Sequence, residues 1–529
     1  MRQLFVGISA FILILIFSIG YFAPPVLWCL IIIIPLIVLG LADMIQNKNA
    51  IKHNFPLIGR LRYILGGIGP EIHQYFVEND EDGKPFSRLN RNVVYKRAAR
   101  ADDTMPFGTQ LNIYEPGYEW LSHSITPANS DELNHDPRII IGGPDCKKPY
   151  EASILNISAM SYGSLSQNAI MALNSGAKIG GFAHNTGEGG LSPYHLKPGG
   201  DIVWQLGTGY FGCRNIDGTF NERLFAERAV LPNVKMIEIK LSQGAKPGHG
   251  GILPAKKVSE EIAKIRLVEM GKDVISPPRH SAFSNPIEMM HFIAKLRELS
   301  GGKPVGFKLC VGIKRQFFAM CKAMVKTGIT PDFITVDGGE GGTGAAPMEF
   351  SDSVGMPLTD GLVFVTDALM GFGLKEKIKI IASGKVVTGF DMIKLLSLGA
   401  DACNSARAMM LALGCIQALR CNTNRCPTGV ATQDASLQAG LSVEDKKVKV
   451  ANFHFQTVKS AVDMMGSAGI KAPAYMNRHH INKRETRNQV RTYAEIYPYV
   501  VTGSMLENAE VPVPELYKDD LQFANDAIF

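Results

Sequence analysis

The distribution of apolar residues divides the chain into two parts that differ sharply. Residues 4–22 (LFVGISAFILILIFSIGYF) and 26–42 (VLWCLIIIIPLIVLGLA) contain no charged residue. Each run is long enough to cross a bilayer as a helix, the second one marginally. An Ala-Pro-Pro sequence separates the runs, which suits a tight turn. The pattern therefore predicts a transmembrane helical hairpin within residues 1–45.

Basic residues flank this hairpin on both sides. Arg2 precedes the first run, and the second is followed by Lys48, Lys52, Arg60 and Arg62. The positive-inside rule then places both ends, and the body of the protein, on the cytoplasmic side. A cleaved signal peptide, a single span or a buried core helix are the alternatives. A second apolar run directly after the first argues against export, so we expect a membrane-anchored protein with a cytoplasmic catalytic domain.

The pattern changes again at about residue 151. Residues 46–150 mix charged and aromatic residues without a long period, which predicts a juxtamembrane adaptor region of loops and short helices. From 151 onward, short β-rich runs alternate with glycine-containing turns and helical patterns. The eight runs are 153–158, 181–185, 201–206, 235–241, 304–309, 332–337, 379–383 and 400–405. Helical stretches include 166–180, 285–300, 315–328 and 388–399.

Eight strands that alternate with helices predict a parallel sheet with crossover connections. Their number, and a span near the typical ~250 residues, indicate an α/β fold of the (β/α)8 TIM-barrel class over residues 151–470. A doubly wound open sheet is the alternative. Residues 471–529 are expected to form a tail that packs on the barrel. Their basic stretch 477–487 is typical of a solvated helix face, with anionic lipid or an acidic electron donor as alternative partners.

Composition excludes several classes of protein. The 55 Lys and Arg against 49 Asp and Glu give a net charge of +6, too small and too dispersed to indicate nucleic-acid binding. Nine cysteines in 529 residues do not make a disulfide scaffold. No GxGxxG motif follows a first strand and no Walker A lysine is present, so neither a Rossmann site nor a P-loop is indicated.

Polar and glycine-rich segments follow six of the predicted strands. A TIM barrel carries its active site at the carboxyl ends of its strands, and glycine there lets backbone N–H groups approach a ligand closely. Gly384 and Lys385 follow the seventh strand, and Ala406 and Arg407 open a short helix after the eighth, where barrels commonly bind phosphate. A phosphate-bearing cofactor is the better interpretation, although glycines can also simply shape tight turns.

A cluster of three cysteines follows directly on the eighth strand. Cys415, Cys421 and Cys426 lie within CIQALRCNTNRCPTGVATQ (415–433), with a spacing that matches neither common zinc motifs nor a CxxC redox pair. Three interpretations remain open: an iron–sulfur cluster, zinc with His454 or Cys403 as a further ligand, or buried free cysteines. The position beside the predicted phosphate loops favours electron transfer.

Several segments resemble the glutamate synthase family. CNTNRCPTGVATQ is similar to that family's [3Fe-4S] segment, and SAMSYGSLS, NTGEGG, IEIKLSQGAKPG, GGTGAAP and SPPRH also resemble its motifs. The resemblance covers about 150–470, the FMN-binding synthase barrel. It implies FMN, a [3Fe-4S] cluster on the three cysteines, and reduction of 2-iminoglutarate, formed from 2-oxoglutarate and ammonia, to glutamate. Such a protein is an oxidoreductase acting on CH–NH2 donors. Because no NAD(P)H site is evident, a ferredoxin-like protein or a separate reductase subunit is expected to donate electrons.

Within this resemblance, individual residues acquire expected roles. Lys308 would stabilise reduced flavin, and Gln205 would hydrogen-bond the flavin ring. Lys246 and Arg266 would clamp a dicarboxylate, since guanidinium suits carboxylate geometry, although Arg266 also fits an ordinary helix surface. Glu188 would relay protons. The expected catalytic residues are thus Lys246, Glu188 and Lys308. The expected cofactor-binding residues are Ser158, Ala159, Met160, Ser161, Gln205, Lys308, Gly341, Gly342, Gly384, Lys385, Ala406 and Arg407.

The sequence also departs from the family pattern. No amidotransferase domain with an N-terminal nucleophilic cysteine fits this chain, so we expect ammonia, or a partner subunit, to supply nitrogen. His249 and Ile252 stand where the family has Glu and Gln, and that glutamine ordinarily belongs to the oxo-acid site. A different imine or oxo-acid substrate, or a membrane-bound electron-transfer subunit, is therefore the alternative. A 2-hydroxy-acid oxidase would share the barrel but would leave the cysteines unexplained.

Overall fold

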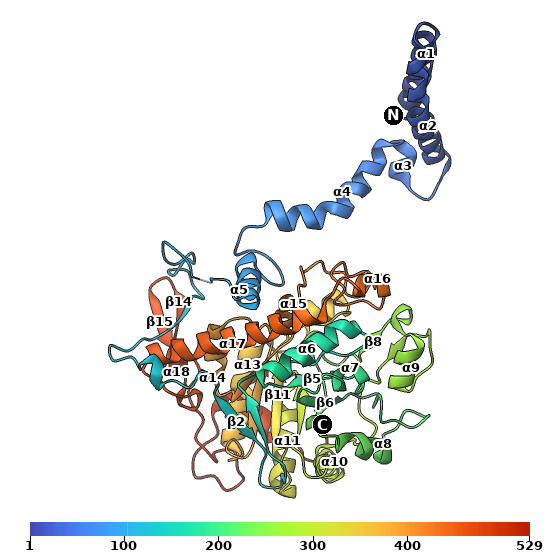
Figure 1. Cartoon of the computed structure of the whole chain (residues 1–529). Helices are drawn as coiled ribbons and strands as arrows, with labels where there is room; N and C mark the ends of the chain where they lie inside the picture. Colours follow the sequence, from blue (N-terminus) through green and yellow to red (C-terminus); the bar gives the residue numbers. More distant parts are fainter. Residues whose placement is uncertain (103) are drawn as a thin grey trace. The chain divides into compact units, whose positions relative to one another are not determined.

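The chain folds into two compact units, Met1–Leu89 and Asn90–Phe529. The computed structural model describes residues 1–102 and 104–529 (Figure 1). The predicted adaptor region 46–150 is thus divided between the two units, and the domain boundaries expected at 45, 150 and 470 stay predictions.

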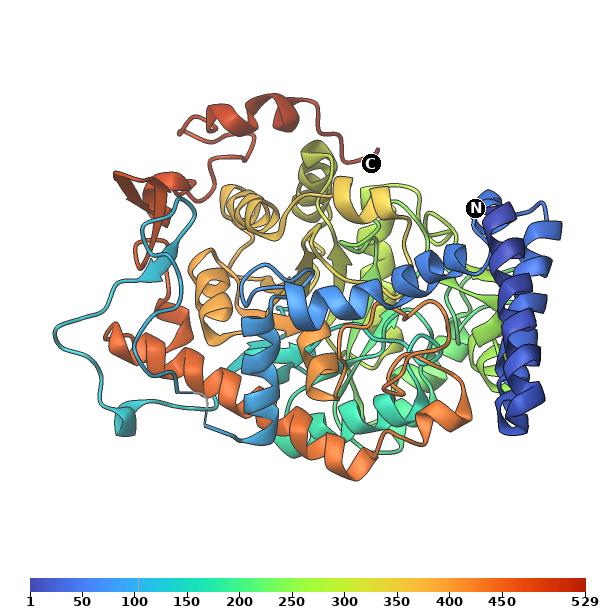
Figure 2. The same cartoon turned by 90° about the horizontal axis from the view of Figure 1, so that it is seen from above.

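The first unit is helical throughout its ordered elements. It contains α1 (Arg2–Phe22), a 3₁₀ helix (Pro24–Cys29), α2 (Leu30–Ile45), α3 (Ala50–Asn54), α4 (Ile58–Ile72) and a π-helical turn (His73–Val77). Helices α1 and α2 lie side by side (Figures 1 and 2). The spans Arg2–Phe22 and Pro24–Ile45 are long and apolar enough to cross a membrane, judged by length and composition.

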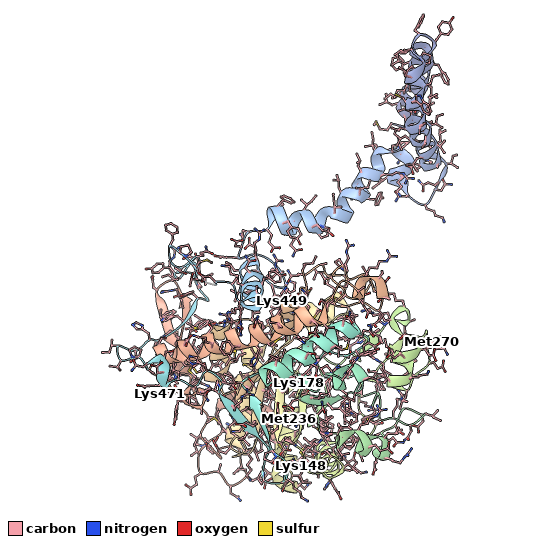
Figure 3. All side chains as sticks on the ribbon, viewed as in Figure 1. Lys148, Lys178, Met236, Met270, Lys449 and Lys471 are labelled. Carbon is pink, nitrogen blue, oxygen red and sulfur yellow. The ribbon has the colours of Figure 1, made fainter. Side chains whose placement is uncertain are left out.

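The side chains of these two spans project outward from the helices (Figure 3). Only 11% of the most apolar window of the first span is buried, and 6% of that of the second. A core helix of a globular protein would bury most of such a window, because apolar side chains gain free energy by leaving water. The exposure therefore disfavours the alternative that either run is a core helix.

The second unit is built around a closed barrel of eight parallel strands, which confirms the predicted TIM barrel and rules out the open sheet. Strand β13 pairs with β4 and thereby closes the ring. The barrel strands are β4 (Leu155–Ile157), β5 (His184–Asn185), β6 (Ile202–Leu206), β7 (Val234–Lys240), β10 (Val305–Leu309), β11 (Phe333–Asp337), β12 (Lys379–Ser383) and β13 (Ala402–Ser405).

Helices surround the strands (Figure 1). Helix α6 begins after the N-cap Ser166, whose hydroxyl accepts from Ala169 N, and ends at Gly181 in the left-handed conformation. Gly176 lets α17 approach α6, because a Cβ there would lie 2.7 Å from Val450. The larger helices are α6 (Gln167–Gly180), α10 (Pro286–Leu299), α11 (Lys314–Thr327), α13 (Leu358–Gly371), α14 (Gly389–Ser397) and α17 (Val443–Ser467).

Shorter elements complete the fold. The remaining helices are α5 (Arg88–Ala99), α7 (Pro193–Leu196), α8 (Glu222–Ala229), α9 (Glu260–Arg266), α12 (Met348–Ser353), α15 (Arg407–Ala412), α16 (Ala435–Gln438), α18 (Tyr493–Ile496) and α19 (Glu515–Gln522). The remaining strands are β1 (Glu119–Leu121), β2 (Arg138–Ile141), β3 (Tyr150–Ser153), β8 (Ile252–Leu253), β9 (Val274–Ile275), β14 (Ile481–Thr486) and β15 (Gln489–Thr492).

An apolar layer fills the amino end of the barrel. The antiparallel hairpin β2–β3 contributes Ile141, Tyr150 and Ala152. These side chains pack in one buried cluster with residues at or near the strand starts, namely Ala183, Val203, Met236, Phe333, Ile381 and Ala402. Since this end is filled by the chain itself, a ligand site in the barrel belongs at the carboxyl end.

The basic C-terminal stretch differs from the expectation of a solvated helix face. Residues 481–486 form strand β14, which pairs with β1 and β15. Arg478 is 1% exposed, and its Nη2 donates to Asp367 Oδ1 of α13 at 2.7 Å. Tyr517 Oη donates to the other oxygen of Asp367 at 2.9 Å. The run of basic residues indicated a solvated helix face, but Arg478 has a partner that only the tertiary fold brings near it.

Candidate active site

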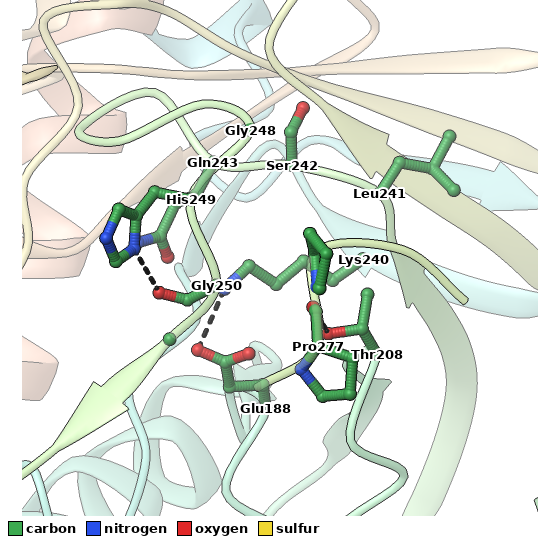
Figure 4. Close-up of a pocket in the computed structure, with 12 residues that line it drawn as sticks. Glu188, Thr208, Lys240, Leu241, Ser242, Gln243, Gly248, His249, Gly250 and Pro277 are labelled. Atoms are coloured by element: carbon green, nitrogen blue, oxygen red, sulfur yellow. Dashed lines mark hydrogen bonds and ion pairs between the residues drawn. The ribbon is translucent and has the colours of Figure 1, made fainter. Parts of the chain in front are cut away.

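A carboxylate whose side chain is 17% exposed lies at the carboxyl end of the barrel. Glu188, in the loop after β5, forms an ion pair with Lys240, the last residue of β7, with 2.9 Å between Oε1 and Nζ (Figure 4). Ser276 Oγ donates to Glu188 Oε2 at 3.2 Å. A pocket opens beside this pair, lined also by residues of the β6, β7 and β9 loops, among them Thr208, Ser242, Gln243, His249 and Pro277.

Three cations act on Glu188. Burial disfavours its ionised form, but the charges of Lys240, Arg266 and Lys246 outweigh that effect and hold the pKa of Glu188 below its ordinary value. The structure thus brings together Glu188, Lys246 and Arg266, whose expected roles stay predictions, and adds Lys240. Lys240 and Lys308 are register partners in the adjacent strands β7 and β10, which places both lysines at the same end of the barrel.

Lys246 lies in the loop after β7 and is 2% exposed. Its Nζ donates to the carbonyl of Ala345 at 2.7 Å, which joins the β7 loop to the β11 loop. Burial lowers the pKa of Lys246 to about 8, although Glu188 attracts the ammonium. The same two loops come closest at Gly244, where a Cβ would lie 1.6 Å from the carbonyl oxygen of Gly338.

Arg266, the last residue of α9, is 4% exposed, so the alternative of a helix-surface role does not hold. Its Nη2 donates to the carbonyl of Tyr162 at 3.1 Å, and its guanidinium lies 5.4 Å from the ring centroid of Phe211. Burial lowers the pKa of Arg266 to about 10, and Glu188 opposes this shift. Its Nε is buried without a hydrogen-bond partner among residues 1–102 and 104–529, as expected where a ligand acceptor completes a site.

A polar layer lies inside the barrel below this site. Glu238 of β7 accepts hydrogen bonds from Asn185 Nδ2, Gln205 Nε2 and Thr335 Oγ1 at 2.8, 2.7 and 2.6 Å. Gln205 is therefore committed to Glu238 in this structure, and its predicted contact with a flavin ring stays a prediction. The internal hydrogen bonds satisfy a carboxylate that would otherwise be costly to bury.

Lys308 of β10 is 5% exposed and pairs with Asp337, the last residue of β11, at 3.5 Å between Nζ and Oδ2. Burial disfavours its ammonium, but Asp337, Glu238 and Glu188 outweigh that effect and raise the pKa of Lys308. The alternative of a surface lysine is thereby excluded. Asp337 also accepts from the backbone N–H of Gly244, so the pair anchors the β7 loop.

The predicted phosphate residues gather where the last three strands end. Arg407 Nη2 donates to the carbonyl of Glu340, and a Cβ on Gly342 would lie 2.6 Å from Arg407 Cδ. Gly341 N donates to the carbonyl of Gly338 in the same turn. Gly384 and Lys385 both have positive φ, and Ala406 is the N-cap of α15. A short helix start, a lysine and an arginine at one edge suit an anion.

The segment after β4 closes the ring of loops. Ser158 N donates to the carbonyl of Ser405, and its hydroxyl lies 3.3 Å from that of Ser383. Ala159 is half-buried, and the carbonyl of Met160 accepts from His195 Nε2. Ser161 Oγ donates to Ser164 Oγ at 3.0 Å. Ser158 therefore adjoins the ends of β12 and β13, beside the phosphate-type loops.

The three cysteines of the 415–426 loop are free thiols that interact electrostatically with one another. Burial raises the pKa of Cys415 to about 11 and also raises that of Cys421. For Cys426 burial acts in the same direction, but hydrogen bonds from Thr428 and nearby backbone N–H groups lower its pKa. In the described part of the chain, no three His, Cys, Asp or Glu side chains are gathered closely enough to hold a metal ion.

The other residues considered as zinc ligands have different partners. His454 Nε2 lies 3.0 Å from the carbonyl of Leu155 and 2.9 Å from Ser153 Oγ, and burial lowers its pKa to about 3. Cys403 is buried in the barrel strand β13, where burial raises the pKa of its thiol.

Lys257 ties the cysteine loop to the barrel, a role that sequence reasoning missed. This lysine is 3% exposed, and its Nζ donates to three carbonyls: Ser164 at 3.1 Å, Cys421 at 2.8 Å and Ala431 at 3.1 Å. Burial lowers its pKa to about 8. Its neighbour Lys256 is exposed. One buried cation thus joins the loop after β4 to both sides of the cysteine loop.

Three more residues of the site were missed. Lys240 ends an apolar strand, the same signal that identified Lys308, and Asp337 ends another. His280 Nε2 donates to the carbonyl of Lys240 at 2.9 Å, and Tyr210 Oη lies 2.9 Å from its Nδ1. Burial lowers the pKa of His280 to about 4, so the ring is neutral at physiological pH. Its protonated Nε2 then holds the backbone carbonyl of Lys240 in place. Its segment SPPRH offered no such signal.

A closed parallel barrel with a cation-rich carboxyl end defines a (β/α)8 protein whose carboxyl end suits anionic ligands. The conserved region in glutamate synthase matches residues 127–471. The chain therefore belongs to the glutamate synthase family. Because this region is the family's FMN domain, membership implies FMN and an oxidoreductase, and the lysine–arginine edge described above fits the phosphate of that cofactor.

Three relatives place the chain within the family. It is 40% identical over 497 residues to the glutamate synthase large subunit-like protein YerD of Bacillus subtilis (strain 168), covering 86% of this chain and 94% of YerD. It is 37% identical over 318 residues to an archaeal glutamate synthase (NADPH) of Methanocaldococcus jannaschii, covering 60% of this chain and 59% of that protein. Ferredoxin-dependent glutamate synthase 2 (chloroplastic) of Arabidopsis thaliana is 35% identical over 278 residues, covering 50% of this chain and 16% of that protein.

Proposed function

We propose that the protein is an FMN and iron–sulfur oxidoreductase that reduces 2-iminoglutarate, formed from 2-oxoglutarate and ammonia, to glutamate. The observation that carries this proposal is the cation cluster around Glu188. Lys240, Lys246 and Arg266 contribute three positive charges and Glu188 one negative charge, which leaves a net charge of +2 at the mouth of the barrel. A dicarboxylate neutralises this charge, whereas an uncharged or monoanionic substrate leaves it buried and uncompensated.

The residues that would hold FMN lie along one edge of the barrel mouth. Arg407, Lys385 and the backbone around Gly384 and Gly342 would bind its phosphate, with Lys308 supplying a cation deeper in the barrel. Cys415, Cys421 and Cys426 would hold a [3Fe-4S] cluster once their thiols are drawn together, since soft thiolates are the usual ligands of iron–sulfur centres. When bound, FMN supplies hydride to the imine carbon and the cluster supplies single electrons.

The chain's own residues then prepare the substrate. Arg266 presents a buried Nε without a partner among the described residues, which suits one carboxylate of the substrate. Lys246 Nζ carries a proton below about pH 8 and suits the second carboxylate. Glu188, ionised between the cations, limits their mutual repulsion before substrate enters. Lys240, Lys246 and Arg266 are themselves buried, so these charges act more strongly than they would in bulk solvent.

A different imine or oxo acid is the second candidate. His249, which replaces a family glutamate, lines the pocket, and its Nδ1 lies 3.0 Å from the carbonyl of Gly250. Its ring also contacts that of Phe350 edge-on, at 5.3 Å between centroids. Ile252, which replaces the substrate-site glutamine, pairs with Ile275 in the small sheet β8–β9 and adds no polar group. An electron-transfer subunit without imine chemistry would keep the cofactor residues but would not need the cation cluster.

The location that fits this function is the cytoplasmic face of a membrane. The two apolar helices would anchor the chain, and the basic residues after α2 would remain on the cytoplasmic side. Electrons would come from a ferredoxin-like protein or a separate reductase subunit.

The test is anaerobic purification of the full chain in detergent, followed by absorption and low-temperature EPR spectra. Adding 2-oxoglutarate and ammonium to the dithionite-reduced protein should reoxidise the flavin and form glutamate. A three-iron signal and flavin without reoxidation would favour a carrier or another imine, and the absence of both would refute the proposal. Arg315→Gln is the matched control for substitutions of site arginines, because Arg315 is exposed outside the site.

A further inference from the structure

Helix α4 carries an apolar face that the rest of the unit Met1–Leu89 leaves exposed. Its apolar side chains are between 40% and 57% exposed, namely Ile58, Leu61, Ile64, Leu65, Ile68 and Ile72. At 3.6 residues per turn, these positions fall within an arc of about 120°. Six large apolar side chains on one exposed stripe form a patch of the kind that marks an interaction surface.

Polar residues border this stripe, and small residues lie opposite it. Arg60 and Arg62 project from its two sides. The Arg62 guanidinium can rise toward water while its methylene stem stays against the apolar face. On the other side of the helix, Gly66 and Gly67 have no described atom within 4 Å of the position a Cβ would occupy. The stripe is therefore not one side of a helix sandwiched between protein layers.

The start of α4 is fixed to the end of the apolar helix α2. Arg60 Nη2 and Nε donate to the two carboxylate oxygens of Asp43 at 2.7 and 2.8 Å, and Asp43 is 1% exposed. Leu57 N donates to the same carboxylate at 3.3 Å. Both views show α4 running across the direction of α1 and α2 (Figures 1 and 2). If α2 spans a bilayer, this bidentate ion pair places α4 where the span leaves it, along the surface.

The charge of this segment suits an anionic surface. Residues 43–72, which end with α4, contain Lys48, Lys52, Arg60 and Arg62 against Asp43 and Glu71, which gives four minus two, or +2. Basic residues beside a membrane span attract anionic lipids. A second copy of this chain would present the same positive charge and would be repelled, which favours lipid over self-association.

We propose that α4 is an interfacial helix, which lies in the plane of the membrane surface with the Ile58–Ile72 stripe in the acyl-chain boundary and Arg62 among anionic head groups. This inference rests on the membrane anchoring proposed above. It adds a second, sideways attachment to a chain otherwise held only by its two spans.

The experiment places the photoreactive residue p-benzoyl-phenylalanine at single positions of the full chain, reconstituted in vesicles of phosphatidylcholine and phosphatidylglycerol. Leu65→p-benzoyl-phenylalanine probes the stripe, and Gly67→p-benzoyl-phenylalanine probes the opposite side of the same helix. Ile34→p-benzoyl-phenylalanine, in α2, reports on the anchor itself. Lipid adducts are measured by mass spectrometry after illumination, and Leu61 serves as a second stripe position if the Leu65 variant fails to fold.

The stripe probe should give at least about fivefold more lipid adduct than the Gly67 probe, as an interfacial helix requires. Lipid adducts at Ile34 but equal labelling at positions 65 and 67 would overturn the inference and leave the anchor intact. Cross-links from position 65 to another protein chain would overturn it too. Absence of lipid adducts at all three positions would overturn both the anchor and the inference.

Discussion

The two ends of the barrel are made by the same eight strands but from opposite kinds of side chain. At the amino end, Phe333 and Ile381 pack with the β2–β3 hairpin in a layer of buried apolar groups. At the carboxyl end, Glu188 lies among Lys240, Lys246 and Arg266 in a similarly buried environment. Apolar burial stabilises the fold by about 25 cal/mol per Å², whereas buried charges cost several kcal/mol each before pairing.

This difference separates stability from chemistry along a single set of strands. The amino end holds the barrel closed, and the carboxyl end keeps charges where only a ligand completes their pairing. Substitutions at one end should therefore change unfolding, and substitutions at the other should change binding. The comparison can be broken by any residue that does both.

The largest effect is expected for Phe333→Ala at the amino end. Removing a fully buried phenyl ring leaves a cavity and should lower the free energy of unfolding by about 3–5 kcal/mol. Chemical denaturation of the full chain in detergent measures this loss, and Ile313→Ala, at an exposed position, is the control. The affinity for 2-oxoglutarate should not change in protein that remains folded. A weakened affinity would contradict the separation of the two ends.

Arg266→Gln should act in the opposite way. It removes a buried guanidinium that we assign to a substrate carboxylate. The free energy of 2-oxoglutarate binding should therefore weaken by about 2–4 kcal/mol, which raises the Kd roughly 30- to 1000-fold. Changes in flavin absorbance on titration report the Kd, and Arg315→Gln should match the parent. Unfolding should be little affected, because the substitution also relieves repulsion among three cations. A large loss of stability with unchanged Kd would assign Arg266 to the scaffold.

Lys257→Met tests the buried lysine that joins the cysteine loop to the barrel. Three carbonyls would lose their shared donor, at a cost of about 1–3 kcal/mol, and the loop should loosen around its thiols. Iron content per chain should fall while FMN content stays the same. Lys256→Met changes the exposed neighbour and should leave both contents unaltered. Equal iron content in the two variants would show that Lys257 has no part in holding the loop.

The smallest effect is a pH dependence from Lys246. Its lowered pKa of about 8 means that the ammonium is present below pH 8 and is lost as the pH rises through that value. Affinity for a dicarboxylate should therefore weaken above pH 8, by up to about tenfold per pH unit. Lys246→Arg keeps its charge and should flatten the profile over pH 7–10. An unchanged profile in that variant would assign the titration to another group.

The barrel could be predicted well from the sequence because its strands coincide with short apolar runs that are recognisable locally. The run DFITVD (332–337) is apolar, β-branched and bounded by turn residues, and it forms β11 (Phe333–Asp337) almost to the residue. A continuous apolar run of this kind indicates a strand that is buried on both faces. The closure of the barrel then follows from the number of such runs.

The contacts at the site could be predicted only in part. Lys246 and Arg266 could be identified because family motifs flank them in the sequence. Lys240, in contrast, forms an ion pair with Glu188, which lies 52 positions away, and no periodicity in the sequence predicts that contact. Lys256 and Lys257 are adjacent in the sequence, but the fold buries only Lys257. The prediction for segment 477–487 was wrong for the same reason, because Arg478 pairs with Asp367, which lies more than a hundred residues earlier in the chain.

The apolar layer at the amino end also determines the route by which ligands can enter and leave the barrel. With β2–β3 and the strand starts filling one end, molecules that reach the barrel interior arrive and depart through the other. Substrate and product would use the same opening of the barrel, so product would have to leave before the next substrate enters. Product should therefore inhibit competitively with the oxo acid, and a bulky group tethered beside the pocket should slow entry and release by the same factor.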